Sequence, residues 1–600
     1  MKIHSLKISG YKRLKDVTIQ FGDATFLIGQ NNCGKSSIIK AIEILLSAKK
    51  QLSTSDYYSI LDEETSEVKV DTTTIILEAE FRNLPEEAKT WRGFKGRIFT
   101  YDVEEDSENS GLSVTYRKTY ELGKDVIIEF KSKVRTVKPE FINCKKPQDY
   151  VDSGLPLEVI SEYFDDLETN VGKSKVAFEK LELIDEIWDI SDDEIWFQNP
   201  GGIPGNVLKM LPRFLLIPVD LGIHEIQGSG NGVLSSTLGE LFQTVRENSV
   251  NFKNAQVHLD NLAKELDPQD ENSEFGKMME ELNGVLSTVF PDSKLHASTS
   301  LSDPSNLKPS FLVEMSSNIK TSVENQGTGM VRATVFGMLR YRQQWLSRKE
   351  DEHSRSLIIC FEEPETYLHP SAANQMREAI YELSSSSSQI IASTHSPYII
   401  DLSRKPKQVL NRLYNSGNHV ECNTFSVTDK FKDLQENDKS YVKMILKIDN
   451  YVSRIFFTKK VVIIEGDTED ILIKESIKRL EKSKYFKILS DFEIIKARGK
   501  ASIISLVKYL TSMGIDPIVV HDRDSNEPNA EKYNEPIANA LGSNGKVVMM
   551  NNNVEDELGY IATYEKPFKA YKKTLEWGEN WEDLPENWRN KLIEIFGDYI

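Results

Sequence analysis

The chain contains, near its first residue, the stretch Gly29-Gln30-Asn31-Asn32-Cys33-Gly34-Lys35-Ser36. Its spacing is that of G-x-x-x-x-G-K-S/T, a loop that holds nucleotide phosphates. An apolar run over residues 24–28 predicts a buried strand before the loop, and the apolar spacing over residues 36–48 predicts a helix after it. Such a loop points backbone N–H groups at phosphates, with Lys35 reaching the β- and γ-phosphates and Ser36 holding Mg²⁺. The stretch predicts an α/β domain whose nucleotide site uses Gly29, Asn32, Gly34, Lys35, Ser36 and Ser37.

Length and composition indicate several domains with real cores. At 600 residues, about three to five domains are expected. No apolar run approaches the roughly 20 residues of a membrane span, and the first residues lack the apolar core of a signal peptide, so a cytoplasmic location is expected. The four cysteines contain no C-x-x-C pair, which argues against a disulfide scaffold or a structural zinc site.

The net charge of −19 disfavours a broadly basic surface for nucleic acid. A solvated acidic surface is the simpler interpretation of that charge. Short basic stretches occur, however, at residues 131–138, 340–349, 496–500 and 566–573. A chain that is acidic overall can still form one basic groove from such stretches.

The order of apolar patterns divides the chain into five parts. An α/β pattern over residues 1–150 is interrupted by a helical pattern over 151–304 and resumes over 305–425. The helical part is expected to be an amphipathic insert that serves dimerisation. A linker is expected over residues 426–454, and a second α/β domain over 455–600, with strands at 460–466, 492–497, 517–521 and 546–550.

Three further motifs accompany the phosphate loop. A predicted strand ends in Glu362 and Glu363, of which the first can bind Mg²⁺ through water and the second can polarise the attacking water. Another predicted strand ends at His395, whose imidazole can contact the γ-phosphate. Gly327 and Gly329 precede a predicted helix, and a glycine-rich turn there can bind an anion. Alone, an acidic pair is usually solvated and a strand-end His is usually structural, so the order of the motifs carries the argument.

This set of motifs resembles the ABC-type ATPases of the structural-maintenance and RecF/Rad50 group. The resemblance implies that residues 327–329 form a loop that completes the ATP site of a second copy of the chain. It therefore implies a homodimer or a larger homo-oligomer.

The last part of the chain places acidic residues at three predicted strand ends. Glu465 and Glu469 follow the first strand, and Asp522 and Asp524 follow a later one. Glu555 lies shortly after a third. Acids at a helix start are favoured by the helix dipole in any case. Three acidic clusters at neighbouring strand ends can also hold one or two Mg²⁺ or Mn²⁺ ions, and two such ions clamp a phosphodiester for hydrolysis.

A strand that ends in Glu-Gly, followed later by D-x-D, resembles the Toprim domain of topoisomerases, primases and some nucleases. With the ATPase motifs, it resembles the OLD family of ATP-dependent nucleases, whose layout the Gabija nuclease subunit and some retron effectors share. The expected fold is an ABC-type ATPase domain with a helical insert, followed by a C-terminal α/β Toprim domain. The resemblance implies a catalytic lysine at Lys566, with Lys569 as the alternative, and metal ligands at Glu465, Glu469, Asp522, Asp524 and Glu555.

The expected function is an ATP-binding endonuclease that nicks or cuts DNA in anti-phage defence. It would use Mg²⁺, with Mn²⁺ or Ca²⁺ possible at the Toprim site, and its ATPase would gate cleavage. The expected partner is a helicase, or a reverse transcriptase with retron nucleic acid. One alternative is an ATP-gated DNA clamp or repair protein whose Toprim domain does not cut. A topoisomerase would need a nucleophilic Tyr in a DNA-gate module, and no such module is recognisable.

Overall fold

The computed structural model describes the chain outside a set of short gaps and one longer region. The residues that are not described are 62–67, 104–105, 169, 172–176, 178–179, 182–183, 201–203, 220–248, 252–253, 256, 259–260, 262–272, 274–275, 279, 281–313, 317–319, 323–333, 336, 340, 342–355, 367, 369, 385–387, 405, 450–451, 544 and 562–563. Met1–Phe214 and Arg355–Ile600 form one compact unit, and Leu215–Ser354 form a second. No helix among the described residues is long and apolar enough to cross a membrane.

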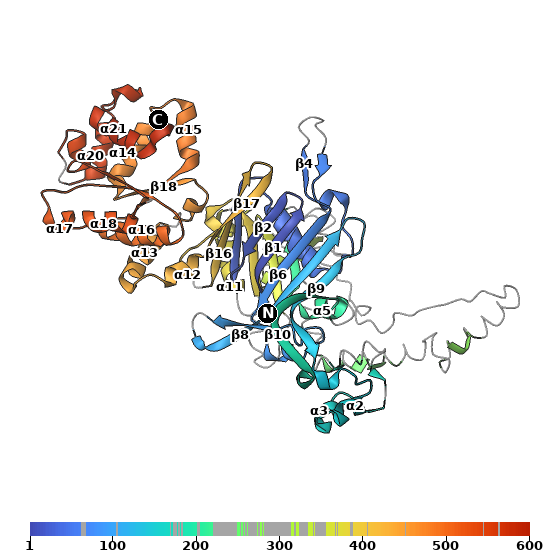
Figure 1. Ribbon diagram of the computed structural model, residues 1–600. Helices are drawn as coiled ribbons and strands as arrows, with labels where there is room; N and C mark the ends of the chain where they lie inside the picture. Colours follow the sequence, from blue (N-terminus) through green and yellow to red (C-terminus); the bar gives the residue numbers. More distant parts are fainter. Residues whose placement is uncertain are drawn as a thin grey trace. The chain divides into compact units, whose positions relative to one another are not determined.

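An antiparallel sheet contains most of the early strands (Figure 1). Its order is β10-β9-β8-β6-β1-β2, and β7 pairs with β8. In β6, buried and partly exposed residues alternate, which is the period of a sheet with one face on a core. The strands are β1 (Lys2–Tyr11), β2 (Leu14–Gln20), β6 (Thr74–Arg82), β7 (Phe99–Val103), β8 (Asp106–Glu121), β9 (Ile127–Val137) and β10 (Trp188–Gln198).

A second sheet carries the phosphate-loop strand in its interior. Its order is β11-β14-β15-β3-β16-β17, and the run from β14 to β16 is parallel. The parallel strands are buried almost throughout, so they read as continuous apolar runs in the sequence. Because they run the same way, the segments after β3, β14 and β15 meet at one edge. The elements are β3 (Ala24–Gly29), α1 (Lys35–Leu46), β11 (Arg213–Ile217), β14 (Leu357–Glu362), α11 (Pro370–Leu383), β15 (Ser388–Thr394), β16 (Gln408–Ser416) and β17 (His419–Phe425).

A third, fully parallel sheet follows near the C-terminus, in the order β19-β18-β20-β21. Its strands are β18 (Lys460–Ile464), β19 (Phe492–Lys496), β20 (Ile518–His521) and β21 (Lys546–Met549). The helices around it are α14 (Asp467–Ile477), α15 (Lys482–Asp491), α16 (Lys500–Ser512), α17 (Pro528–Glu531), α18 (Asn534–Leu541), α19 (Val554–Glu557), α20 (Lys566–Thr574) and α21 (Glu586–Phe596). The predicted α/β architecture with a C-terminal α/β domain is thus confirmed.

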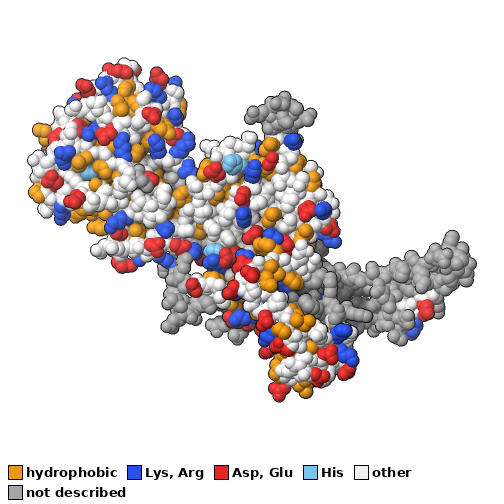
Figure 2. All heavy atoms as spheres, in the orientation of Figure 1, with side chains coloured by type: hydrophobic (Ala, Val, Ile, Leu, Met, Phe, Trp, Pro, Cys, Tyr) orange, Lys and Arg blue, Asp and Glu red, His pale blue; other side chains and the backbone are white. Residues whose placement is uncertain are grey.

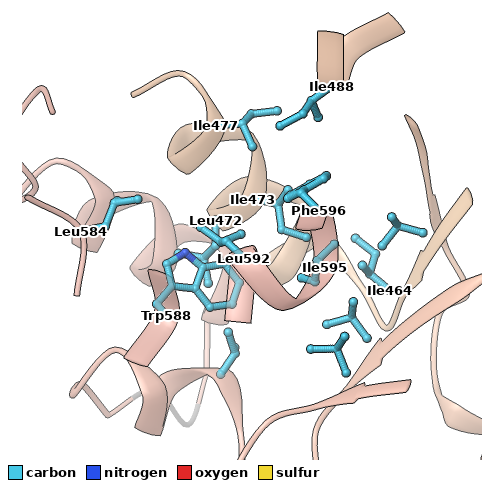
Figure 3. Packing of buried hydrophobic residues seen from close by; sticks show 14 of the residues in the cluster. Ile464, Leu472, Ile473, Ile477, Ile488, Leu584, Trp588, Leu592, Ile595 and Phe596 are labelled. Carbon is cyan, nitrogen blue, oxygen red and sulfur yellow. The ribbon is translucent and has the colours of Figure 1, made fainter. Parts of the chain in front are cut away.

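The core of this last region is closed by α21 (Figure 3). Trp588 is fully buried beside Leu472 and Leu592, and its Nε1 donates a 2.8 Å hydrogen bond to Ser476 Oγ. A buried indole needs such an acceptor for its N–H. The bond therefore ties α21 to α14, the helix that follows the first acidic strand end.

The segments between these sheets are only partly described. The range 151–304, expected to be a helical insert, includes α3 (Leu157–Ser161) and α5 (Pro204–Met210), but also β10 and β11, which join the two sheets. Most of residues 251–289, and both Gly327 and Gly329, lie outside the described residues. Within 426–454 the chain forms α12 (Val427–Lys432) and α13 (Glu436–Ile448). Acidic and basic side chains are interspersed over the face that Figure 2 shows.

Candidate functional site

The phosphate loop joins β3 to α1 through two glycines in conformations that other residues rarely adopt. Gly29 has a φ of 146° and Gly34, the N-cap of α1, a φ of 91°. A Cβ on Gly29 would lie 2.3 Å from the carbonyl oxygen of Leu413 and 2.7 Å from Cys33 Sγ. Glycine is therefore required at this position both for the turn and for the close approach of β16.

Lys35 lies folded over its own loop. Its Nζ donates hydrogen bonds to the carbonyl oxygens of Gly29, at 2.9 Å, and of Gln30, at 2.8 Å. Burial lowers the pKa of its ammonium group. The cation is therefore held at the mouth of the N-terminus of α1, where free N–H groups also favour an anion.

A cavity of about 970 Å³ opens in front of this loop, a volume that suits a nucleoside triphosphate. The phosphate loop forms part of its wall, and Glu363 and His395 form another part. Glu362 ends β14 next to it and is half-buried. The predicted nucleotide residues that line the cavity are Asn32, Gly34, Lys35, Ser36, Ser37, Glu363 and His395.

Glu363 and His395 face each other at the edge of the sheet. The Oε1 atom of Glu363 lies 3.5 Å from His395 Nε2. Burial, and then the Lys35 cation, lower the pKa of His395, which favours the neutral imidazole, while the Glu363 carboxylate acts in the opposite direction. A neutral imidazole and a carboxylate can together orient a water against a bound phosphate.

The sequence reasoning did not give a role to Glu365, which organises this edge. Its Oε1 accepts hydrogen bonds from Thr394 Oγ1 at 2.7 Å and from the His395 backbone N–H at 3.0 Å. Burial raises the pKa of this carboxyl group. Glu365 therefore fixes the backbone from which His395 projects. A local signal exists in the E-x-E spacing, but its partners are 29 and 30 residues away.

The third sheet brings the second set of acidic residues together at its carboxyl edge. Glu465 follows β18, and its Oε1 accepts a 2.9 Å hydrogen bond from the Asp522 backbone N–H, which follows β20. Glu469 lies in the first turn of α14 and accepts from the Gly466 N–H at 3.0 Å. These contacts hold both carboxylates at the strand ends.

Two lysines face this acidic edge. Lys566 Nζ lies 3.2 Å from Glu555 Oε1, and Lys500 Nζ lies 2.7 Å from Asp524 Oδ2. Lys569, the alternative to Lys566, instead lies over the ring of Tyr564, with its Nζ 4.2 Å from the ring centroid. Of the two C-terminal lysines, the structure thus places Lys566 beside the acidic residues.

Comparison with known proteins identifies these two regions. Residues 1–400 match the family described as AAA ATPase domain, and residues 456–524 match the TOPRIM domain of proteins like the overcoming-lysogenization-defect protein. The chain belongs to the AAA ATPase domain family. It joins this domain to an OLD-like TOPRIM domain, and the resemblance to the OLD family is thereby confirmed.

The curated relatives of this chain are distant in sequence. The Old nuclease of Escherichia phage P2 is 24% identical over 56% of this chain, which spans 58% of that relative's length. Endonuclease GajA of Bacillus cereus (strain HuB5-5) is 23% identical over 85% of this chain and is covered over 72% of its length. A solved structure of the SmcHead bound to the C-winged helix domain of ScpA matches 72% of this chain and 99% of its own length, with 13% identity and a TM-score of 0.32.

The acidic edge of the OLD-like TOPRIM domain is electrostatically strained by its own carboxylates. Burial, and then the carboxylates of Glu469, Glu465, Asp524 and Glu555, raise the pKa of Asp522 to about 9. Burial also raises the pKa of Glu465 to about 7. Buried carboxylates that repel each other are stabilised by a shared cation.

The donor set fits a hard divalent cation. Asp522 Oδ1 and Glu555 Oε2 are buried and have no hydrogen-bond partner among the described residues. Carboxylate oxygens are the preferred ligands of Mg²⁺ and Mn²⁺. Within the described part of the chain, no three acidic, His or Cys side chains already converge as closely as ligands on one ion. Binding a metal would therefore draw these carboxylates together.

Two residues of the TOPRIM edge were not predicted from the sequence. Lys500, at the start of α16, is buried and donates a 3.0 Å hydrogen bond to Asn534 Oδ1 besides its contact with Asp524. The hydroxyl of Tyr560 is buried without a hydrogen-bond partner among the described residues. Burial and the carboxylates of Glu555, Glu469 and Asp522 raise its pKa, so it remains a proton donor. Neither residue belongs to a local motif.

Proposed function

We propose that this chain is an ATP-binding endonuclease that cleaves DNA, by nicking or double-strand cutting, with divalent metal at its OLD-like TOPRIM domain. The observation that carries the proposal is the acidic edge formed by Glu465, Glu469, Asp522, Asp524 and Glu555, of which Glu469, Asp522 and Glu555 are buried. A protein gains no stability from carboxylates that raise each other's pKa, so such an edge is best explained by the cation it holds. Mg²⁺ or Mn²⁺ there would polarise the phosphodiester and activate the attacking water.

The chain's own residues have defined parts in this proposal. Glu465, Glu469, Asp522, Asp524 and Glu555 would supply metal ligands. Lys566, beside Glu555, would stabilise charge that develops on the phosphate. In the ATPase domain, Lys35 and Ser36 would hold the phosphates of ATP and its Mg²⁺, and Glu363 would be the base, with His395 beside it.

ATP is proposed to gate cleavage through assembly of two or more copies. The described cavity has the phosphate loop on one side, and the loop with Gly327 and Gly329 would be supplied by the second copy. Assembly would then depend on bound ATP, and it would control cleavage by the TOPRIM domain. An operon-encoded partner, a helicase or a reverse transcriptase with retron nucleic acid, would supply the trigger.

A plasmid-cleavage assay with Mg²⁺ or Mn²⁺ tests the nuclease proposal. The wild type is expected to convert supercoiled DNA to nicked or linear DNA, and Glu465→Ala and Asp522→Ala are expected to abolish the conversion. Glu535→Ala, which removes an exposed carboxylate on α18, is the matched control and is expected to cleave normally. Lack of metal-dependent cleavage by the wild type with its partner would favour the ATP-gated clamp.

The proposed role in antiviral defence rests on the resemblance to the OLD family. It is tested by phage challenge of cells that express the wild type with its partner. Protection that is lost in Asp522→Ala and kept in Glu535→Ala would support defence through cleavage. Equal plating of phage on all three strains would refute it.

A further inference from the structure

The exposed side of α20 carries aromatic rings next to lysines and begins at the acidic edge. We propose that this side of α20, with Tyr564 before it, binds an unpaired nucleic-acid strand and leads it to the metal site. The proposal deepens the proposed function, because it names the form of nucleic acid that the TOPRIM domain would take. The variants that test it leave the acidic residues and Lys566 unchanged.

Four large apolar side chains are exposed in this segment. The exposed fractions are 70% for Tyr564, 53% for Phe568, 45% for Tyr571 and 66% for Leu575. Phe568 and Tyr571 are three residues apart on α20, and Leu575 follows four residues later, so they share one side of the helix. The opposite side is buried through Ala570 and Thr574 against α14 (Figure 1). A group of exposed apolar side chains of this kind indicates an interaction surface.

Lysines lie beside the aromatic rings. This combination favours a partner that has both negative charges and planar groups that can stack on the rings. Lys569 Nζ lies 4.2 Å from the centroid of the Tyr564 ring, and Lys572 Nζ lies 4.7 Å from that of Phe568. Residues 564–575 contain four lysines and one glutamate, although the whole chain has a net charge of −19. Aromatic side chains that stack bases, together with cations that meet phosphates, are the means by which proteins hold single strands. An apolar protein partner would account for the rings but not for the lysines.

The helix is continuous with the acidic edge. Lys566, its first residue, lies 3.2 Å from Glu555, at the helix end where the dipole disfavours a cation. The acidic edge therefore accounts for the position of this lysine. A helix of nine residues is about 13 Å long, which corresponds to about four stacked nucleotides. A strand laid along α20 would thus reach Glu555 with its bases unpaired, as in single-stranded DNA or a frayed duplex end.

Fluorescence anisotropy with a short labelled oligonucleotide in EDTA tests the proposal without cleavage. The double variant Phe568→Ala/Tyr571→Ala is expected to bind the single strand about tenfold or more weakly than the wild type, because each stacked base contributes about 1–3 kcal/mol. Its affinity for a blunt duplex, and for an abasic strand, is expected to be unchanged. Phe486→Ala/Leu489→Ala on α15 removes two similarly exposed apolar side chains and is the matched control, with wild-type binding expected.

The lysines are tested by salt dependence. Lys569→Gln/Lys572→Gln is expected to lower the slope of log affinity against log salt by about 1.4, which corresponds to two phosphate contacts on a single strand. Wild-type binding of the single strand by Phe568→Ala/Tyr571→Ala would overturn the proposal. So would a change in oligomeric state in light scattering without a change in binding, which would assign the face to a protein contact. Because metal is absent, these results stand apart from whether the wild type cleaves DNA.

Discussion

Replacing Asp522 by Asn should stabilise the protein when no metal is bound. Asp522 is buried beside Glu465, Glu469, Asp524 and Glu555, which together with burial raise its pKa from 3.8 to about 9. The amide keeps the size and the acceptor oxygen of the carboxylate but removes the proton equilibrium. The change therefore isolates the electrostatic cost of gathering these carboxylates.

The sign and size of the effect follow from this pKa. Because the native pKa lies above the unfolded one, the native state keeps a proton that the unfolded state releases between about pH 4 and pH 9. Each rise in pH within that window lowers the free energy of unfolding. At pH 7 the native Asp522 keeps its proton although the pH lies about three units above its unfolded pKa. Allowing for relaxation of the cluster, we expect Asp522→Asn to raise the free energy of unfolding by about 2–4 kcal/mol.

Thermal unfolding in EDTA measures the stability without metal, and thermal unfolding in Mg²⁺ measures the stabilisation by the bound cation. In EDTA at pH 7 the variant is expected to melt roughly 5 °C or more above the wild type, with a flatter dependence on pH. Mg²⁺ is expected to raise the melting temperature of the wild type, by preferential binding to the native state, and to have little effect on the variant. Glu535→Gln is the control and should behave as the wild type. A variant that melts below the wild type in EDTA, or an equal response to Mg²⁺, would refute the reasoning.

Three further predictions concern the ATPase domain and the interior of the TOPRIM domain. Lys35→Ala should lose binding of a fluorescent ATP analogue, since its Nζ is the cation of the phosphate loop; wild-type affinity would contradict this. Glu363→Gln should bind ATP but release little phosphate, and turnover at the wild-type rate would place the base elsewhere. Burial raises the pKa of Glu493 on β19 to about 7, so this group alone should contribute a fall of about 2–3 kcal/mol in wild-type stability between about pH 4.5 and 7, in addition to the contribution of Asp522. Glu493→Gln should remove this contribution to the dependence of stability on pH in thermal melts. Equal pH dependence in the variant and the wild type would show that Glu493 does not have a raised pKa.

The strands and the phosphate loop could be predicted because their signals are local. The run over residues 24–28 became β3 with one residue added, and the expected strand at 492–497 became β19 with one residue removed. Parallel strands buried on both faces are continuous apolar runs, and the acidic motifs at Glu362, Glu465 and Asp522 end or directly follow such runs. The common edge at which these motifs meet then follows from parallel strand order alone.

The supporting contacts could not be predicted because they join residues that no local pattern connects. Lys500 reaches Asp524 across 24 positions, and Glu365 reaches the His395 N–H across 30. Lys566 is the expected lysine and Lys569 the alternative, and the path of α20 places the first beside Glu555 and the second over Tyr564. The strands β10 and β11 lie within a range expected to be helical, and they pair with β9 and β14, respectively.

The position of β3 between β15 and β16 also sets a time at which the ATP site can form. Synthesis proceeds at about 5–20 residues per second, so roughly 20–70 s pass between the emergence of β3 and that of β15. During this interval the residues of the phosphate loop have been synthesised, but the neighbouring strands β15 and β16 have not. The Leu413 carbonyl of β16, which packs against Gly29, is therefore also missing. A fragment that ends before β15 would contain every residue of the loop and still be unable to bind ATP.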